Sequence, residues 1–275
     1  MMRVDAHQHF WAIARGDYGW MHLSDKLAPL RRDFFPADFE NHRAKYKIDR
    51  TVLVQAGPSI EETEYMLGLA DATAWIAKVV GWVDFEVADH RRHLERWARH
   101  GKFSGVRPMI QDIEDTDWML RPDVQWGYAA TCALDLTFDA LGLPRHLDNF
   151  LRLFDRYPKM RVVIDHGMKP AIRDDGFDNW ATKMSAIAEK TGAYCKLSGL
   201  ATEAHDGWNA ATLQPYAQHI IDSFGADRVM WGSDWPVINL AGGYDAWAAA
   251  AEEIVKPADR DAIFGGTAKE FYRIG

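Results

Sequence analysis

The sequence of 275 residues has few cysteines, no excess of basic residues and no long apolar run. Its two cysteines, Cys132 and Cys195, are too few and too far apart in the chain for a disulfide scaffold. Asp plus Glu (40) outnumber Lys plus Arg (32), and the net charge of -8 argues against a nucleic-acid partner. No apolar stretch approaches the roughly 20 residues that span a bilayer, so we expect no membrane partner either.

Two further motifs are missing. The N-terminal segment MMRVDAHQHFW carries charge and two histidines where a signal peptide needs an apolar segment, which favours a cytoplasmic protein. There is no Gly-x-Ser-x-Gly motif, the nucleophile turn of many serine hydrolases, since Ser233 stands in Gly-Ser-Asp-Trp. Cys195 lies inside a strand-like run, where core packing explains it better than catalysis.

What the chain does contain is a regular alternation of short apolar runs and longer helical patterns. With 48% hydrophobic and 26% charged residues it has the composition of a globular protein, although its twelve tryptophans stand out. Alternating strands and helices indicate a parallel sheet. A doubly wound sheet usually has a glycine-rich first turn, whereas the first strand here leads into HQHFW. We therefore predict one α/β domain over residues 1–275, a (β/α)₈ TIM barrel. The predicted strands are 3–9, 50–56, 79–85, 104–110, 134–138, 161–166, 193–198 and 228–234, and helical segments include 61–75, 89–100, 145–156, 180–191 and 211–224.

Two predicted loops are longer than simple connections. Residues 11–35 follow the first strand, and residues 111–122, rich in Asp and Glu, follow the fourth. A barrel of this kind places its working loops at the carboxyl ends of its strands. Both loops are therefore candidate lids or substrate walls, with simple decoration as the alternative.

The carboxyl ends of the predicted strands collect metal-ligand residue types. His7 and His9 are two positions apart and point to the same face of the first strand. His166 ends the sixth strand and Asp234 the eighth. Taken alone, the His-x-His pair could arise by chance, and a strand-end His or Asp could equally be a helix cap or a hydrogen-bonded loop residue. Together they surround one barrel mouth with ligand types suited to a single divalent metal, with zinc the first candidate.

Other strand ends supply candidate substrate contacts. Arg107 closes the fourth strand, where it would hold a polar oxygen or form a salt bridge. Lys196 and Ser198 share a face of the seventh strand and are candidate partners of sugar hydroxyls. Aromatic faces pack on the C–H face of a sugar ring, although tryptophan is more often a packing residue. The remaining candidates are Gln55 and Asp84 at the second and third strand ends, Trp235 beside Asp234, and Trp11 and Trp20 on the first long loop.

The combination of DAHQHFW, VVIDHG and VMWGSDWP resembles the amidohydrolase superfamily over essentially the full length. More narrowly it is similar to the lactonase branch of the amidohydrolase 2 group, which includes L-fuconolactonase, L-rhamnonolactonase and 2-pyrone-4,6-dicarboxylate lactonase. The segments GVRPMI, LDLTF and YCKLSG add weaker support. The resemblance assigns His7, His9, His166 and Asp234 to the four mouth positions of the family.

The sequence departs from the binuclear members of that family. They carry a bridging Lys or Glu after the fourth strand and a His after the fifth, whereas these strands read Gly-Val-Arg-Pro and Leu-Asp-Leu-Thr-Phe here. One metal at most is therefore expected, and some lactonases of this branch work without metal.

We accordingly expect a hydrolase that opens a small-molecule sugar lactone, as in L-fucose degradation. Asp234 is the candidate general base, and His166 is a metal ligand or polarises the carbonyl. One alternative is metal-dependent decarboxylation of an aromatic or conjugated acid on the same fold. A mouth rich in carboxylates, with Asp84, Asp112 and Asp139, disfavours such acids. The other alternative is a non-catalytic ligand-binding barrel.

Overall fold

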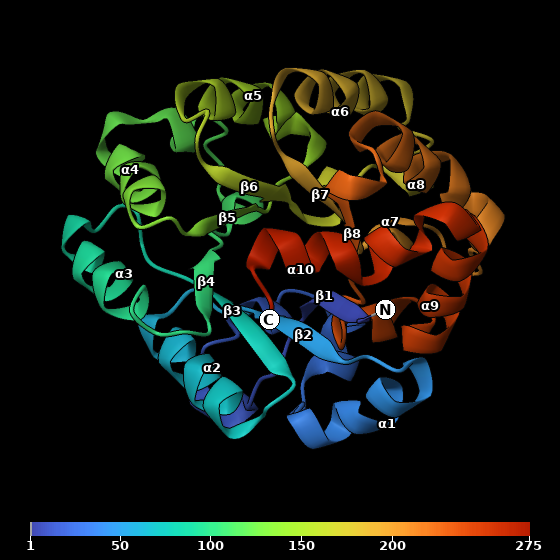
Figure 1. Ribbon diagram of the computed structural model, residues 1–275, viewed down its shortest axis with the longest axis horizontal. Helices are drawn as coiled ribbons and strands as arrows, with labels where there is room; N and C mark the ends of the chain where they lie inside the picture. Colours follow the sequence, from blue (N-terminus) through green and yellow to red (C-terminus); the bar gives the residue numbers. More distant parts are fainter. Residues whose placement is uncertain (1) are drawn as a thin grey trace.

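Eight parallel strands pair in chain order from β1 to β8, and a ring of helices surrounds them (Figure 1). The computed structural model describes residues 2–275. This arrangement confirms the predicted single-domain (β/α)₈ barrel. The strands are β1 (Val4–Gln8), β2 (Arg50–Val54), β3 (Ile76–Gly81), β4 (Phe103–Val106), β5 (Thr137–Ala140), β6 (Arg161–Ile164), β7 (Tyr194–Leu197) and β8 (Val229–Trp231). The α-helices are α1 (Pro36–Tyr46), α2 (Ile60–Ala72), α3 (Arg91–Trp97), α4 (Gln125–Ala133), α5 (Leu147–Arg156), α6 (Asp178–Lys190), α7 (Leu200–Glu203), α8 (Ala210–Phe224), α9 (Gly243–Ile254) and α10 (Thr267–Tyr272).

The helices follow from apolar spacing and from capping. Helix α5 buries Leu147, Phe150 and Phe154, which stand three or four residues apart and so share one face. Helix α2 begins after Ser59, whose Oγ accepts the amide hydrogen of Glu62 at 3.0 Å. Within residues 2–275, no helix is both long and apolar enough to cross a membrane.

The barrel closes between its first strand and the segment after its last. The amide of Asp234 donates to the carbonyl of His7 at 2.8 Å, and the amide of His9 donates to the carbonyl of Trp235 at 2.7 Å. The closing hydrogen bonds therefore join the two segments that carry the predicted metal ligands. The seam fixes the spacing of these ligands through the backbone.

Several strands are shorter than predicted at their carboxyl ends. The runs 161–166 and 228–234 end as strands at Ile164 and Trp231. His166 has φ 54° and Asp234 has φ 57°, a left-handed conformation that no strand contains. The residues wrongly predicted as strand therefore include the candidate functional residues His166 and Asp234, which lie beyond the strand ladder and face the mouth.

Strand β5 lies later than predicted, at Thr137–Ala140 instead of 134–138. Leu134 and Leu136 form part of the turn after α4, where an apolar pair resembles the start of a strand. The sequence indicated that Asp139 belongs to the mouth. This prediction is wrong, because Asp139 lies within the strand and is fully buried. A buried carboxylate needs a partner, and Asp139 has one in the barrel interior.

A bulge in β1 sends neighbouring side chains in different directions. Asp5 pairs with Thr51 and Gln8 with Leu53, so three steps along β1 match two along β2. Asp5 consequently faces outward, where its Oδ2 accepts from Tyr244 of α9 at 3.4 Å. His7 faces inward, where its Nδ1 lies 3.1 Å from Lys196 Nζ.

Helix α10 lies across the middle of the barrel and covers its N-terminal end (Figure 1). Phe271 and Tyr272 pack there against inward-facing residues of the strands, among them Val4, Val52 and Val80. This inner cluster is separate from the larger cluster between strands and surrounding helices. The bottom of the barrel is thus plugged, and only the opposite end is left for a ligand.

Truncating this plug is expected to destabilise the whole barrel. Phe271→Ala removes a side chain that is 4% exposed and is expected to lower the free energy of unfolding by about 3–5 kcal/mol. Phe35→Ala is the matched control, since Phe35 is 38% exposed and a surface change costs within about 0.5 kcal/mol. Urea unfolding measures both; equal midpoints for the two variants would contradict the role of α10 as a plug.

Candidate active site

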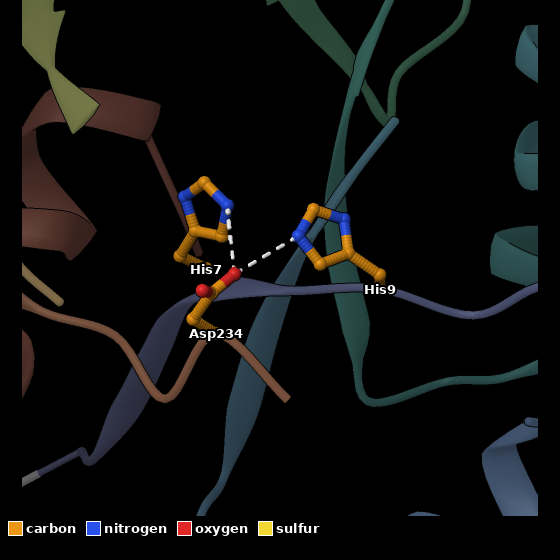
Figure 2. A group of neighbouring side chains, drawn as sticks. All are labelled: His7, His9 and Asp234. Carbon is orange, nitrogen blue, oxygen red and sulfur yellow. Dashed lines mark hydrogen bonds and ion pairs between the residues drawn. The ribbon is translucent and has the colours of Figure 1, made fainter. Parts of the chain in front are cut away.

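Three predicted residues converge on one point at the barrel mouth. His7 and His9 come from β1 and the residue after it, and Asp234 from the loop after β8. Asp234 Oδ1 lies 3.2 Å from His9 Nε2 and 3.7 Å from His7 Nε2. Figure 2 shows both imidazoles turned toward this carboxylate oxygen. All three residues are buried, so the cluster faces a shielded environment.

His166 joins the cluster from the far side. Its Nε2 lies 3.9 Å from the same Asp234 oxygen, and its ring centroid lies 4.4 Å from that of His7. It also forms a second possible ligand group with His7 and Asp165, the residue that precedes it. The structure therefore brings all four predicted residues together around Asp234 Oδ1.

Two glycines make room for these imidazoles. A Cβ on Gly199 would lie 2.5 Å from His166 Nδ1, and a Cβ on Gly232 would lie 2.6 Å from His7 Cβ. Gly199 also has φ 63°, a conformation that favours glycine. Close backbone approach at these positions holds the rings against the neighbouring strands.

The donor chemistry of His9 fits a cation at this point. Its Nδ1 lies 2.7 Å from the carbonyl oxygen of Val54, which accepts hydrogen bonds only, so this nitrogen carries the hydrogen. In the neutral ring, Nε2 then presents a lone pair to a carboxylate oxygen at 3.2 Å. Two acceptors facing each other at this distance need a cation between them, a metal ion or a proton.

The ligand spacing also fits a metal. Atoms about 2.1 Å from a common tetrahedral centre lie about 3.4 Å apart. The separations of 3.2 and 3.7 Å from Asp234 Oδ1 to the two imidazole nitrogens bracket that value. The residues present therefore fit one divalent ion, held by His7, His9 and Asp234, with His166 within reach.

Burial and neighbouring charges set the protonation states. Burial lowers the pKa of His166 to about 4 against the opposing charge of Asp234, so this imidazole is neutral at pH 7. Burial also opposes ionisation of Asp234, but the imidazoles, His166 foremost, outweigh it and hold its pKa below the usual range. Burial, reinforced by Lys196, lowers the pKa of His7. Neutral imidazoles beside an ionised carboxylate are what metal ligation requires.

Ser198 orients His166 instead of lining the mouth. Its Oγ lies 2.8 Å from His166 Nδ1, and its side chain is fully buried. Ser198→Ala is expected to lower activity by about 10–100-fold, as the loss of an orienting hydrogen bond behind a ligand does. Steady-state kinetics measures this effect. Thr202→Ala, which removes a hydroxyl that donates to the Gly199 carbonyl at 2.8 Å, is the control. Equal activity in the two variants would contradict the orienting role.

Lys196 lies below the mouth in a buried charge network. Its Nζ is 2.6 Å from Asp139 Oδ2, 3.0 Å from Asp165 Oδ1 and 3.1 Å from His7 Nδ1. Tyr272 of α10 donates to the same Asp139 oxygen at 2.7 Å. All these side chains are fully buried except for slight exposure of Tyr272. Lys196 is thus placed to support His7 from beneath, away from any sugar hydroxyl.

Arg107 and Gln55 are locked to each other behind the cluster. Gln55 Nε2 donates to the Arg107 carbonyl at 2.8 Å, and the Arg107 guanidinium donates to the Gln55 carbonyl. Arg107 NH1 also lies 3.3 Å from Asp165 Oδ2 and 3.3 Å from His7 Nε2. Arg107 thus forms the salt bridge that was one of its two predicted roles, and it also lines the cavity above the cluster.

The predicted tryptophans divide between packing and cavity wall. Trp235 is 2% exposed among Phe10, Phe34 and Phe39, and Trp11 is fully buried with its Nε1 bonded to the Arg32 carbonyl. Neither lines a described cavity above the cluster. Trp20 does, with its Nε1 donating to the Ala56 carbonyl at 2.7 Å.

A cavity of about 260 Å³ lies above the cluster. Its floor holds His9, Arg107, His166 and Asp234, and both predicted long loops contribute to its walls. Lys169, which the sequence analysis did not single out, adds a cation to the wall, and its Nζ donates to Gln111 Oε1 at 2.6 Å. Its place three residues after His166, on the same strand-end loop, was the available signal. The full wall comprises His9, Trp20, Leu23, Leu27, Ala56, Arg107, Met109, Gln111, Asp112, Leu141, His166, Lys169, Asp234 and Val237.

Glu62 ties helix α2 to the loop after β2. Its two carboxylate oxygens accept from the amides of Ala56 at 2.9 Å and Gly57 at 2.8 Å. Burial raises the pKa of Glu62 to about 8, although both amide hydrogen bonds oppose the shift. The carboxyl group of Glu62 thus holds the backbone at Ala56, which is part of the cavity wall. Its pKa is strongly raised.

This shift predicts a pH dependence of stability. Between the unfolded pKa of 4.5 and the folded value of about 8, the folded state binds a proton that the unfolded state has released. Stability is therefore expected to fall as pH rises through this range, by up to about 1.4 kcal/mol per pH unit. Urea unfolding from pH 5 to 8 tests this, because Glu62→Gln should remove that part of the slope. If the unfolding free energies of wild type and Glu62→Gln changed with pH in parallel, the predicted contribution of Glu62 would be refuted.

Comparisons with known proteins place these residues in a family context. The sequence pattern of the amidohydrolase family matches residues 4–274. A Burkholderia ambifaria protein named L-fucono-1,5-lactonase is 44% identical, over 99% of this chain and 96% of its own length. A Burkholderia multivorans protein of the same name is 34% identical over the same shares. A crystal structure of a Burkholderia multivorans amidohydrolase with bound zinc superimposes with a TM-score of 0.93 at 33% identity, covering 100% of both chains.

Proposed function

This chain belongs to the amidohydrolase family, and we propose that it hydrolyses a sugar lactone of the L-fucono-1,5-lactone class to the aldonic acid. The enzyme is a lactonase, as relatives of 44% and 34% identity over nearly the whole chain support. The observation that carries the site assignment is the meeting of His9 Nε2 and His7 Nε2 at Asp234 Oδ1, with His9 and Asp234 lining the cavity.

His7, His9 and Asp234 would hold a divalent metal, with His166 as a further ligand or as a donor to the carbonyl. Zinc is the proposed ion, because imidazole and carboxylate ligands suit it and a similar amidohydrolase contains it. Such an ion, when bound, acidifies water and polarises a carbonyl group. A cytoplasmic enzyme of L-fucose degradation is consistent with this chemistry and with the free thiols of Cys132 and Cys195.

Asp234 performs the proton transfers. Its Oδ1 faces the three imidazoles, and its other oxygen, Oδ2, accepts the proton of the attacking water. Attack on the lactone carbonyl gives a tetrahedral intermediate, whose C–O bond to the ring oxygen then breaks. The proton on Asp234 passes to that departing oxygen, which becomes the new hydroxyl group. The carbonyl carbon ends as a carboxylic acid, which releases the second proton of the water to the solvent and becomes a carboxylate.

Arg107 and Lys169 supply positive charge to the cavity in which this reaction takes place. Both line the cavity, and Arg107 lies beside the imidazole of His7. They stabilise the oxyanion that develops on the carbonyl oxygen and then the product carboxylate. Ser198 and Lys196 act indirectly, by positioning His166 and His7.

The two alternatives from the sequence are not favoured. A decarboxylase would use a similar metal site, but the relatives of 44% and 34% identity are named lactonases. A non-catalytic barrel has no need for three imidazoles and a carboxylate whose pKa lies below its usual range. Reaction assays can separate all three possibilities.

The proposal is tested with a panel of aldonolactones that includes L-fucono- and L-rhamnonolactone, with conjugated acids beside them. Acid release above the spontaneous rate from an aldonolactone is expected, together with about one equivalent of zinc in wild type and much less in His9→Ala. The zinc is measured by elemental analysis. Carbon dioxide release without acid release would establish the decarboxylase instead. No turnover of any substrate would favour the non-catalytic ligand-binding barrel.

A further inference from the structure

A second, larger cavity of about 610 Å³ adjoins the catalytic one. Trp20, Leu23, Met109 and Asp112 line both, so the two spaces lie side by side at the barrel mouth. The catalytic cavity of about 260 Å³ falls below the about 300–1,000 Å³ typical of small-molecule sites, and the two together lie within that range. The reaction described above uses none of the residues that line the outer cavity alone.

The outer cavity lies over the ends of β2, β3 and β4, which are neighbours in the barrel (Figure 1). Pro58 follows β2, residues 82–86 follow β3, and residues 108–113 follow β4. The catalytic cluster stands over β1, β6 and β8 instead. A ligand that spans both cavities would therefore point one end at Asp234 and the other at Trp82 and Asp84.

The lining combines aromatic faces with carboxylates. Trp20, Trp82, Phe85 and Trp118 contribute rings, and Asp17, Asp84, Glu86 and Asp112 contribute acids. Arg15 pairs with Asp17 and Arg121 with Glu86. Within residues 2–275, no Lys, Arg or His side chain forms an ion pair with Asp84 or Asp112. Asp84 Oδ1 accepts the amide hydrogen of Glu86 at 2.8 Å and Asp112 Oδ2 accepts from Gln111 Nε2 at 3.4 Å, so within the same residues Oδ2 of Asp84 and Oδ1 of Asp112 remain to accept from a ligand. Rings for stacking and carboxylate oxygens for hydroxyl groups suit a neutral polyhydroxylated ring and repel an anion.

We propose that the outer cavity is a subsite for a second sugar ring, so that the enzyme accepts the lactone end of a disaccharide acid. This inference rests on the proposed lactone hydrolysis and specifies its substrate class. In a 1,5-lactone, C4 lies across the ring from the carbonyl carbon. With the carbonyl at Asp234, a glycosyl group on O4 extends past Met109 and Asp112 into the outer cavity. There Trp82 stacks on it and Asp84 accepts from its hydroxyls.

The experiment compares L-fucono-1,5-lactone with its 4-O-β-D-galactosyl derivative. The measured quantity is the ratio of kcat/KM for the glycosylated lactone to kcat/KM for the parent lactone. Wild type is expected to hydrolyse both, with a ratio above one. Trp82→Ala is expected to lower the ratio about 10-fold and Asp84→Ala about 2–10-fold. Partial misfolding lowers both rates equally and cancels in the ratio.

Trp208→Ala is the matched control, because Trp208 is also half-buried but lines neither cavity, and its Nε1 donates to the carbonyl of Ala241 at the end of η12 (Val237–Ala241). Its ratio is expected to equal that of wild type. Hydrolysis of the parent lactone alone, or ratios that Trp82→Ala and Trp208→Ala change equally, would overturn the subsite and leave the lactonase function standing. Failure to hydrolyse either lactone would overturn both.

Discussion

Asp234→Asn is expected to lower kcat for lactone opening by about 10²–10⁴-fold. The amide keeps the size of the side chain and one oxygen for His7 and His9, but it accepts no proton from water. The three imidazoles hold the pKa of the wild-type carboxyl below its usual range, so the base is fully ionised at neutral pH. Initial rates with saturating lactone, corrected for spontaneous opening, measure the loss.

Asp206→Asn is the matched control for this substitution. Asp206 is an exposed carboxylate on the loop after α7, at the same end of the barrel, and lines neither cavity. Its replacement is expected to leave kcat within a factor of two of wild type. If Asp234→Asn kept more than a tenth of the wild-type kcat, Asp234 would not be the general base.

Lys196→Met is expected to cause a large loss of stability, about 3–5 kcal/mol of unfolding free energy. The substitution leaves Asp139 and Asp165 fully buried without the ammonium group that lies 2.6 and 3.0 Å from them. Since a buried unpaired carboxyl takes up a proton, the loss should be smaller at pH 5 than at pH 8. Urea unfolding at the two pH values measures both effects.

Two further variants separate this network from ordinary ion pairs. Lys45→Met removes a pair of similar length, 2.8 Å to Asp245, whose side chains are 58% and 57% exposed, and should cost at most about 1 kcal/mol. Adding Asp139→Asn to Lys196→Met should recover part of the loss, because one stranded charge is gone. Equal losses in Lys45→Met and Lys196→Met would contradict the buried network.

The fold and the grouping of the candidate metal ligands could be predicted from the sequence for the same reason. Strand-to-helix alternation identifies a barrel, and a barrel brings the carboxyl ends of all its strands to one mouth. His7, His9, His166 and Asp234 were therefore neighbours by topology before any distance was known. The left-handed backbone of His166 and Asp234, by contrast, could not be read from the apolar pattern, which is why the predicted sixth and eighth strands ran too far.

The depth of a side chain within the barrel was less predictable. Sequence spacing places Lys196 and Ser198 on one face of β7, but it does not say that Lys196 lies below the mouth while Ser198 bonds His166. Trp11 and Trp235 were predicted to contact the substrate because they are close in sequence to candidate ligands. They lie near the site but do not line the cavity. Asp84 belongs to the outer cavity because β3 ends at Gly81, earlier than its apolar run indicated.

The central claim is that this barrel opens the ring of a sugar lactone. Its most direct test is the rate of proton release from freshly dissolved L-fucono-1,5-lactone at constant pH, with the spontaneous rate measured beside it. We expect a rate proportional to enzyme concentration, with kcat on the order of 1–10³ s⁻¹. A rate equal to that of the enzyme-free solution at every enzyme concentration would contradict the assignment.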